Sequence, residues 1–422
     1  MKNIDYKKII VEFCRILLGA VFVFSGFVKA VDPLGSAYKN IEYLSAFGLD
    51  FFQILALPLA FAQIAVEFAM GACLLAGVYR RFHSILFLAF MCVMTPLTLY
   101  LALKNPVSDC GCFGDALIIT NWQTFYKNIV LLAAAVVIFL DYKKITPLFK
   151  TSSLAFWFTA FSYLFIIGIS LYCYLYLPIL DFRPYKIGAN IPQLMEIPED
   201  APVNEYEISL IYAQDGVEQV FSRENYPKGD STWTFVDTQR TLIKKGYEPP
   251  IHDFSITTED GDDITGDVLG NQSYTFLLIA HKLEKANDLQ IDKINALYDF
   301  CKANNYDFYC LTASLPADIE EWRAGTGAEY PFCTTDDTTL KTIIRSNPGW
   351  LLLKDGVIIN KWSNLGIPAA AKWTAPLESS VYGQIPANHA KRNIVFIGLV
   401  FICVSLLFLW CDRKSSNKDQ TK

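Results

Sequence analysis

The sequence predicts an α-helical membrane bundle that carries a separate α/β domain. The 422 residues are 53% hydrophobic and only 18% charged, and the apolar residues concentrate in 9–178 and 394–411. Residues 181–390, in contrast, have the mixed composition of a soluble domain. Long apolar blocks need lipid and charged segments need water, so one chain with both compositions folds in two solvents.

Six apolar stretches approach the roughly 20 residues that an α-helix needs to cross a bilayer. They are residues 9–31, 51–78, 85–103, 124–140, 154–177 and 394–411. The fourth carries Lys127 and Asn128 in its first turn, but its run IVLLAAAVVIFL is too apolar for a loop. Trp122, Phe125 and Tyr126 precede this run and suit the lipid headgroup region, so we count it as a span.

Basic residues mark every second connection between the spans. Lys and Arg cluster before span one, between spans two and three, between spans four and five, and after span six. Because such loops stay in the cytoplasm, this pattern predicts both termini in the cytoplasm of a bacterial-type inner membrane. It places 32–50, 104–123 and 179–393 outside, in the periplasm. The domain is expected to be acidic, since 181–390 has 31 acidic and 17 basic residues.

The part of the chain after the fifth span alternates between strand and helix patterns. EISLIYAQDGVEQVFS alternates around Asp215-Gly216, which predicts a β-hairpin, and from 248 on apolar strands alternate with helical patterns, which indicates parallel strands. The predicted segments are a four-helix membrane domain (1–150), a fifth transmembrane helix (151–180), a β-rich lead-in (181–247), an α/β domain (248–368), a linker (369–393), a sixth transmembrane helix (394–411) and a cytoplasmic tail (412–422).

Ionisable side chains inside a bilayer are costly and therefore mark candidate sites. Arg15 and Lys29 in the first span and Glu67 in the second are the candidate intramembrane binding site. Arg15 and Lys29 can instead reach the headgroups with long side chains, and Glu67 can form a purely structural pair with a basic residue. Both alternatives stay open.

Cys110 and Cys112 lie on the second outside loop and are the candidate catalytic redox pair. The predicted compartment favours oxidation, Gly111 permits a tight ring, and a strained exposed disulfide exchanges with other thiols. A static loop staple, or two thiols without a role, are the alternatives. No metal is expected, because two thiolates are half of a zinc site. The flanking Asp109 and Asp115 are expected to raise the pKa of both thiols.

Short motifs follow one another through residues 8–141. They are Arg15-Ile-Leu-Leu-Gly19, Phe24-Ser25-Gly26, Lys29, Asp32-Pro33, Gly35, Glu67, Gly71, Gly77 and, as the most specific, Cys110-Gly-Cys-Phe-Gly114. Their order resembles the DoxX family and its relative MauE. The resemblance implies a role in maturing a disulfide-rich protein, or in quinol oxidation and thiol stress, and it makes a quinone the cofactor to test.

Residues 248–366 carry a second resemblance. Pro250-Ile-His-Asp-Phe254, Asn347-Pro348-Gly349 and Lys354-Asp355-Gly356 are similar to elements of the thioredoxin-like fold of the peroxiredoxin and TlpA type, with Pro348 as its binding-site cis-proline. MauD, the companion of MauE, is thioredoxin-like, so the chain resembles a MauE–MauD fusion. No cysteine stands at 281–287, where a dithiol would follow the strand YTFLLIA, so a docking role is expected. Cys333 is expected near the proline loop, as a further binding residue.

The sequence leaves two functions open, only one of them enzymatic. The first is an inner-membrane redox protein, linked to thiol–disulfide exchange or to a quinone, whose domain docks an extracytoplasmic thiol protein or client. The second is a scaffold or sensor that binds a lipid, a quinone or a protein partner. Membrane lipid is a partner in both cases, and nothing in the sequence indicates nucleic-acid binding.

Overall fold

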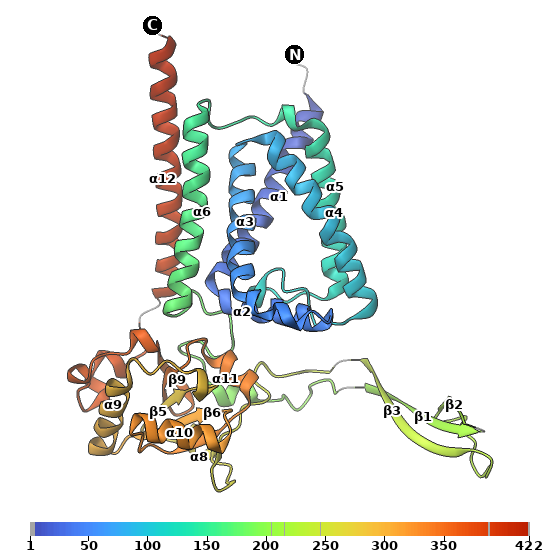
Figure 1. Cartoon of the computed structure of the whole chain (residues 1–422), viewed down its shortest axis with the longest axis vertical. Helices are drawn as coiled ribbons and strands as arrows, with labels where there is room; N and C mark the ends of the chain where they lie inside the picture. The colour runs from blue at the N-terminus through green and yellow to red at the C-terminus, as the bar shows by residue number, and fades with distance from the viewer. Residues whose placement is uncertain (1–4, 204, 215, 245, 387–388, 421–422) are drawn as a thin grey trace.

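The computed structural model describes residues 5–203, 205–214, 216–244, 246–386 and 389–420. Figure 1 shows a helical bundle joined to an α/β domain, with a narrow β-sheet extending to one side. Among the described residues, six helices are long and apolar enough to cross a membrane. The predicted combination of a membrane bundle and an α/β domain is therefore confirmed.

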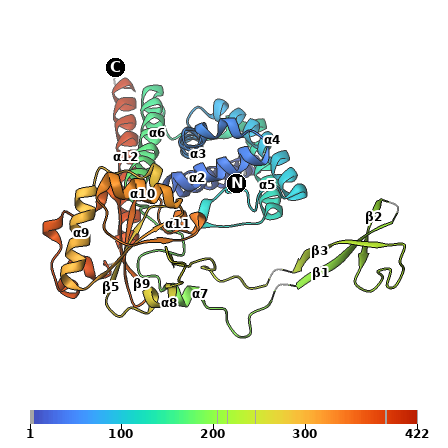
Figure 2. The same ribbon diagram turned by 60° about the horizontal axis from the view of Figure 1, so that its bottom comes forward.

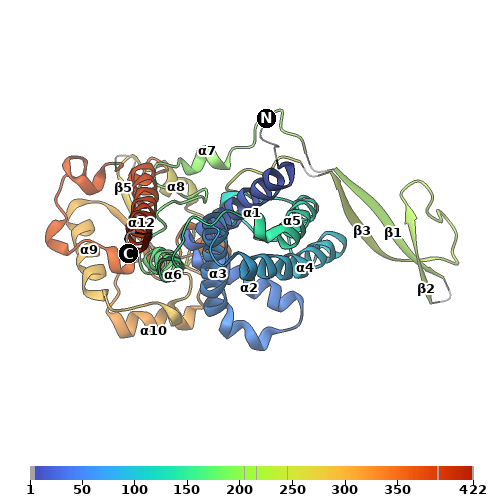
Figure 3. The same ribbon diagram turned by 90° about the horizontal axis from the view of Figure 1, so that it is seen from above.

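The six long helices coincide with the six predicted spans. They are α1 (Tyr6–Val31), α3 (Ala56–Ala76), α4 (Arg80–Lys104), α5 (Asn121–Asp141), α6 (Ser152–Leu175) and α12 (His389–Gln420). Seen from above, α1, α3, α4 and α5 form one group, and α6 and α12 pair beside it (Figure 3). Gly26 lets α1 approach α3, since a Cβ there would lie 2.6 Å from the Phe68 nitrogen. This close approach aligns the two helices that carry Lys29 and Glu67.

Helix α2 (Pro33–Ala46) is an element that the sequence analysis missed. The Asp32 carboxylate caps it by accepting a hydrogen bond from the Gly35 nitrogen at 2.9 Å, and Pro33 occupies its first turn. It lies across the end of the bundle that faces the α/β domain (Figure 1). The short helix η1 (Asp50–Leu55) then leads into α3.

The α/β domain contains a six-stranded sheet. In spatial order its strands are β4 (Thr257–Thr258), β7 (Phe332–Thr334), β6 (Asp307–Thr312), β5 (Tyr274–Ile279), β8 (Gly349–Lys354) and β9 (Val357–Ser363). β5, β6 and β7 are parallel, and β8 and β9 form an antiparallel hairpin beside β5. Helix α9 (Ile291–Asn304) joins β5 to β6, and α10 (Pro316–Thr326) joins β6 to β7. A βαβ unit followed by such a hairpin is the thioredoxin-like topology.

Helices cover both faces of this sheet (Figure 2). Successive residues of β5 point to opposite faces, so Phe276 joins a core with α9 and α10, while Leu277 joins a second core. The second core includes α8 (Thr265–Gly270) and α11 (Asp337–Ile343).

Two predicted domain boundaries are wrong. Tyr185 and Ile191 of the predicted lead-in are buried in the second core, and Ile191 begins the short helix α7 (Ile191–Met195). Trp373 and Leu377 of the predicted linker are buried in the first core. Their apolar side chains are isolated between polar, Pro and Gly residues, so no periodic pattern reveals that these segments pack on the domain.

The sheet beside the domain has three antiparallel strands in the order β2-β1-β3. They are β1 (Glu205–Gln214), β2 (Val217–Ser222) and β3 (Thr234–Lys244). β1 and β2 form the hairpin that the alternation predicts, although Asp215 at its turn lies outside the described residues. β3 was not predicted.

Candidate functional site: a dithiol loop between two cavities

Cys110 and Cys112 lie in the connection between α4 and α5. Their Sγ atoms are 2.8 Å apart, with Cys110 buried and Cys112 half-buried. Gly111 between them has φ +66°, a left-handed conformation that glycine adopts at little cost. Its nitrogen donates to Asp109 Oδ1 at 2.7 Å, which closes the turn. The structure thus brings the two thiols together in one tight turn, here called the dithiol loop (residues 109–115).

The membrane bundle holds the dithiol loop through its backbone. The Tyr43 hydroxyl of α2 donates to the Cys110 carbonyl at 3.0 Å. Ser25 Oγ of α1 lies 2.7 Å from both the Cys112 carbonyl oxygen and Glu67 Oε2, and its single proton can be donated to either. The Ser25 hydroxyl therefore lies between the backbone of the loop and a buried carboxylate.

The two thiols have opposite acid–base properties. The hydrogen bond from Cys110 lowers the pKa of Cys112 to about 6, and the cations Lys127 and Lys29 act in the same direction. The same hydrogen bond, together with burial, raises the pKa of Cys110 far above its ordinary value. The expectation that Asp109 and Asp115 raise both pKa values is therefore wrong for Cys112.

Both aspartates that flank the thiols are paired with cations. Lys39 Nζ lies 3.1 Å from Asp109 Oδ2, and Arg345 Nη2 lies 3.4 Å from Asp115 Oδ2. Each pairing offsets negative charge near the sulfur atoms. This explains why Cys112 ionises more readily than a sequence with two adjacent aspartates suggests.

Of the three candidate intramembrane residues, Lys29 and Glu67 meet and Arg15 does not join them. Lys29 Nζ lies 2.7 Å from Glu67 Oε1, and Gln63 Nε2 donates to the same oxygen at 3.0 Å. Arg15 pairs with Glu12 at 2.8 Å, about 21 Å along α1 from Lys29 at 1.5 Å per residue. The predicted three-residue site is therefore wrong in including Arg15, because helical spacing puts it near the other end of the bundle.

One cavity, the membrane cavity, lies on the bundle side of the dithiol loop. It has a volume of about 320 Å³, within the range of small-molecule sites. Phe22, Phe90 and Leu131 contribute to its mainly apolar wall. Its polar lining includes Ser25, Lys29, Tyr43, Glu67, Cys112 and Lys127. The ammonium of Lys127 lies 4.4 Å from the ring centroid of Phe113. This contact places the Lys127 cation next to the dithiol loop.

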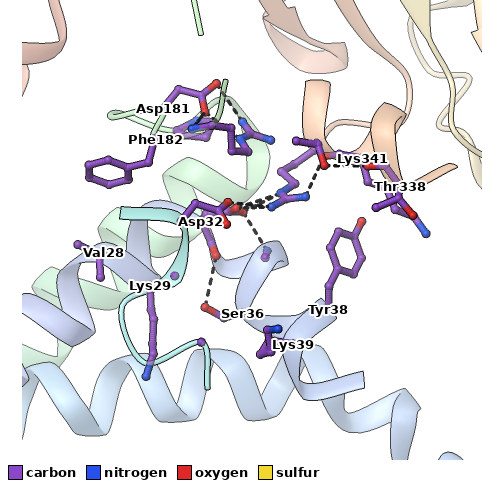
Figure 4. Close-up of a pocket in the computed structure, with 18 of the residues that line it drawn as sticks. Val28, Lys29, Asp32, Ser36, Tyr38, Lys39, Asp181, Phe182, Thr338 and Lys341 are labelled. Carbon is purple, nitrogen blue, oxygen red and sulfur yellow. Dashed lines mark hydrogen bonds and ion pairs between the residues drawn. The ribbon is translucent and has the colours of Figure 1, made fainter. Parts of the chain in front are cut away.

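A second cavity, the interface cavity, separates the dithiol loop from the thioredoxin-like domain. Its volume is about 690 Å³, and it is lined by α2, the dithiol loop, the segment 178–183 and the domain. Asp32 lies at its centre with an ion pair to Arg345 and hydrogen bonds from Gly35 and Ser36, and Lys341 and Thr338 of α11 lie near Tyr38 of α2 (Figure 4). Gly111 lines this cavity and Cys112 lines the other, so the dithiol loop is the wall between them.

The domain turns the end of β5 toward the interface cavity. His281 lies there, and burial, with Lys341 nearby, lowers its pKa to about 4, so its ring is neutral at pH 7. The Asn347–Pro348 peptide is cis, and Asn347 Nδ2 donates to the Lys282 carbonyl at 2.7 Å. The loop that contains Pro348 therefore contacts the segment 281–287, where a dithiol would stand in a redox-active thioredoxin-like domain.

Cys333 does not belong to this site. It is 2% exposed on β7, and β6 and β5 separate it from β8, which follows Pro348. Burial raises its pKa to about 11. The expectation that Cys333 lies near the proline loop is wrong, because proximity in the sequence order of strands does not give proximity in the sheet.

Four residues of the site escaped the sequence analysis as functional candidates: Ser25, Tyr43, Lys127 and Arg345. Ser25 stands in the Phe24-Ser25-Gly26 motif, and Lys127 is a cation in the first turn of an otherwise apolar span. Both therefore had a visible signal. Tyr43 and Arg345 had none, since each acts through a contact made only in the folded chain.

Comparisons with known proteins agree with this division. Residues 7–141 match the family described as Methylamine utilisation protein MauE, and residues 206–245 match a Domain of unknown function (DUF8463). A curated relative, Protein TlpB of Flavobacterium psychrophilum, is 28% identical over 129 residues, or 30% of this chain. The match spans 35% of that relative's length, about a third.

Two solved structures are similar to the domain at low identity. StoA from Bacillus subtilis is 16% identical, with 28% of this chain and 90% of that chain covered and a TM-score of 0.23. A thioredoxin-like protein from Aeropyrum pernix is 13% identical, with 28% of this chain and 84% of that chain covered and a TM-score of 0.24. The fold assignment itself rests on the strand order given above. The chain thus joins a membrane bundle that is similar to MauE to a thioredoxin-like domain and resembles a fusion of the two.

Proposed function

We propose that this protein is an inner-membrane dithiol oxidoreductase that transfers electrons from an extracytoplasmic thiol protein to a quinone. The observation that carries the proposal is the position of the Cys110–Cys112 pair, 2.8 Å apart, at the wall of an apolar cavity within the bundle. A water-exposed disulfide exchanger would not need such a cavity behind its thiols.

The chemistry balances in two half-reactions. In the first, two thiols of the client become a disulfide while the Cys110–Cys112 disulfide is reduced to two thiols. In the second, Cys110 and Cys112 re-form their disulfide and release two electrons and two protons. A bound quinone accepts the two electrons and the two protons and becomes a quinol.

The residues of the site suit these steps. Cys112 has the low pKa, so it leaves readily as the thiolate when a client thiolate opens the disulfide, whereas Cys110 takes up a proton and keeps it until the disulfide re-forms. Lys127 stabilises the Cys112 thiolate electrostatically. Ser25 Oγ lies within 2.7 Å of both the Cys112 carbonyl and Glu67, so it holds the backbone of the loop beside a buried carboxylate.

The membrane cavity fits a quinone ring by its chemistry. Phe90, Met91 and Leu131 provide an apolar wall, and Asn128 and Lys127 provide polar groups that can donate to quinone oxygens. Because quinones dissolve in the hydrocarbon of the bilayer, a cavity bounded by transmembrane helices is where they would bind.

For the topology we propose that the domain is periplasmic and both termini are cytoplasmic. The first residues of α1 and the last of α12 lie at the end of the bundle away from the domain (Figure 1). Arg80 and Arg81 begin α4, and Lys143 and Lys144 follow α5, at that same end, as the positive-inside rule requires. A C-terminal reporter that is active only outside the cytoplasm should stay inactive, and its activity would contradict this orientation.

Differential alkylation in intact cells tests the redox function. Cys110 and Cys112 should be found partly as a disulfide whose fraction falls when the quinone pool is kept reduced. Cys110→Ser and Cys112→Ser should lose envelope thiol oxidation while the protein still inserts. Cys92→Ser in α4 is the matched control and should behave as wild type. If both loop variants also behaved as wild type, a scaffold or sensor that only binds its partner would be the better account.

A further inference from the structure

We infer that the thioredoxin-like domain, although it lacks a dithiol, completes the membrane dithiol site by holding the dithiol loop in place through Arg345. Arg345 is thus a positioning residue for Cys110 and Cys112. This inference deepens the proposed function and rests on it for the redox role of the loop. The domain would serve as a fixed cap over the membrane thiols.

Arg345 joins three parts of the chain. Its Nη2 lies 2.7 Å from Asp32 Oδ2, and its Nε lies 3.1 and 3.0 Å from the two Asp32 oxygens, so the contact is bidentate. The same Nη2 lies 3.4 Å from Asp115 in the dithiol loop. One guanidinium therefore connects the domain to the start of α2 and to the loop that carries the thiols.

The guanidinium is itself held rigidly. Its Nη1 donates to the Lys341 carbonyl at 2.8 Å, and its Cζ atom lies 5.3 Å from the ring centroid of Tyr38. Only 13% of the Arg345 side chain and 17% of Asp32 are exposed, so water screens the pair little. Although burial acts to raise it, the pKa of Asp32 is held below its ordinary value by Arg345. Both partners therefore stay charged around neutral pH.

The dithiol loop is held from both sides of the thiols. Lys39 of α2 fixes Asp109 before Cys110, and Arg345 of the domain reaches Asp115 after Cys112. α2 belongs to the same arrangement, because Asp32 caps it and Tyr43 bonds the Cys110 carbonyl. Releasing Arg345 would therefore loosen the loop directly at Asp115 and indirectly through α2.

The charges on the two walls of the interface cavity are complementary. The domain and the segment before it contribute five basic side chains and one acidic one, Asp181, although the domain is acidic as a whole. The basic side chains are Arg183, Lys282, Lys285, Lys341 and Arg345. The bundle contributes four carboxylates and two lysines. An acidic domain that concentrates its basic residues on one face, against carboxylates, has a surface suited to docking there.

The connection from α6 to the domain is also fixed. Lys361 of β9 is buried and its Nζ lies 3.0 Å from Asp181, which in turn pairs with Arg183 at 2.8 Å. Lys361 also donates to the Tyr185 and Ile343 carbonyls at 2.9 and 2.6 Å. The segment that leaves α6 is thereby attached to the sheet, so the domain is held by two clusters of charge.

A double-mutant cycle on the full chain in lipid nanodiscs tests the inference. The variants are Arg345→Gln, Asp32→Asn and the double variant, with Asn chosen because it preserves the helix cap. Arg323→Gln is the matched control, since Arg323 is an ion-paired arginine of the same domain that binds Glu259 at 2.8 Å. The readouts are the pH profile of Cys112 alkylation, followed on its peptide, and amide hydrogen exchange in 109–117.

Arg345→Gln and Asp32→Asn should each move the midpoint of Cys112 alkylation to higher pH, because a loosened loop no longer holds Cys112 beside the Cys110 thiol and the cations that lower its pKa. Exchange in 109–117 should accelerate more than tenfold. The double variant should match the larger single effect, and Arg323→Gln should match wild type. Unchanged profiles in Arg345→Gln, or additive effects in the double variant, would overturn the inference. Neither readout needs the thiols to turn over, so a failure of the proposed electron transfer would leave this test intact.

Discussion

Arg345 and Asp32 lie 313 positions apart in the sequence and form a bidentate ion pair between the thioredoxin-like domain and the start of α2. This pair sets the relation of the domain to the dithiol loop. Of the two carboxylates that Arg345 contacts, Asp32 is the closer one. Arg345 Nη2 lies 2.7 Å from Asp32 Oδ2 and 3.4 Å from Asp115 Oδ2.

Asp115→Asn should loosen the dithiol loop less than Asp32→Asn does. The interaction of Asp115 with Arg345 is longer than that of Asp32, at 3.4 Å against 2.7 Å. The Asp115 side chain is also 43% exposed against 17% for Asp32, so water and salt screen its charge more. Amide hydrogen exchange in the dithiol loop should therefore rise by a smaller factor in Asp115→Asn than in Asp32→Asn. Added salt should change the exchange rate of Asp115→Asn least, because this variant has already lost the exposed pair that salt screens. An equal or larger effect of Asp115→Asn would mean that Asp115 is the main anchor.

Lys127→Met should slow the alkylation of Cys112 at pH 6 to 7. The pKa of Cys112 is about 6, so in the wild type the thiolate, which is the reactive form, increases through pH 6 and predominates above it. Removing a cation that favours the thiolate raises this pKa, and the midpoint should move to higher pH. The same maximal rate at high pH would show that the site stays accessible. Lys104→Met, a change at the end of α4 outside the cavity lining, should leave the midpoint where it is.

Glu67→Gln should reduce the stability of the bundle more than Glu67→Gln combined with Lys29→Met. The single change leaves the Lys29 ammonium buried without its carboxylate, and removing one partner of a buried pair costs about 3–5 kcal/mol. The double change removes both charges and should recover part of that loss. Thermal unfolding in detergent and the amount of inserted protein measure the difference, and a double variant no better than the single would contradict a paired role.

Lys361→Met should lower the free energy of unfolding of the domain by about 3–5 kcal/mol, which is the range for removing one partner of a buried ion pair. Asp181 would keep only Arg183, and the Tyr185 and Ile343 carbonyls would each lose a hydrogen bond from Lys361. Lys354→Met is the matched control, because Lys354 pairs with an exposed Glu378 in the short helix η7 (Leu377–Ser379) and its loss should cost little. Urea unfolding followed by domain tryptophan fluorescence compares the two, and equal losses would contradict this ranking.

The sequence contained most of the architecture. Each span was visible as an apolar block, and the order of strands and helices after residue 248 was enough for the thioredoxin-like topology. Both signals are local, since hydropathy and periodicity are read over ten to twenty neighbouring residues. The paired cysteines were visible as well, because Cys110-Gly-Cys112 is short enough for its spacing to fix its geometry.

The arrangement of the site was not visible, because it depends on contacts between distant segments. Nothing near Arg345 in the sequence indicates that it meets Asp32, and nothing near Asp109 indicates that Lys39 offsets its charge. The expected rise of the Cys112 pKa was wrong for this reason. The position of Arg15 relative to Lys29 is a different case, since their spacing along one helix already separates them.

The proposal that Cys110 and Cys112 reduce a quinone is the central claim, and a stoichiometric titration tests it most directly. The fully reduced protein in nanodiscs would receive one equivalent of a short-chain quinone, with quinol formation followed by absorbance and free thiols of the 105–120 peptide counted by alkylation. The account predicts one quinol for each Cys110–Cys112 disulfide, none with Cys112→Ser, and wild-type behaviour with Cys92→Ser. Two thiols that stay free in the wild type, or equal quinol formation in Cys112→Ser, would contradict it.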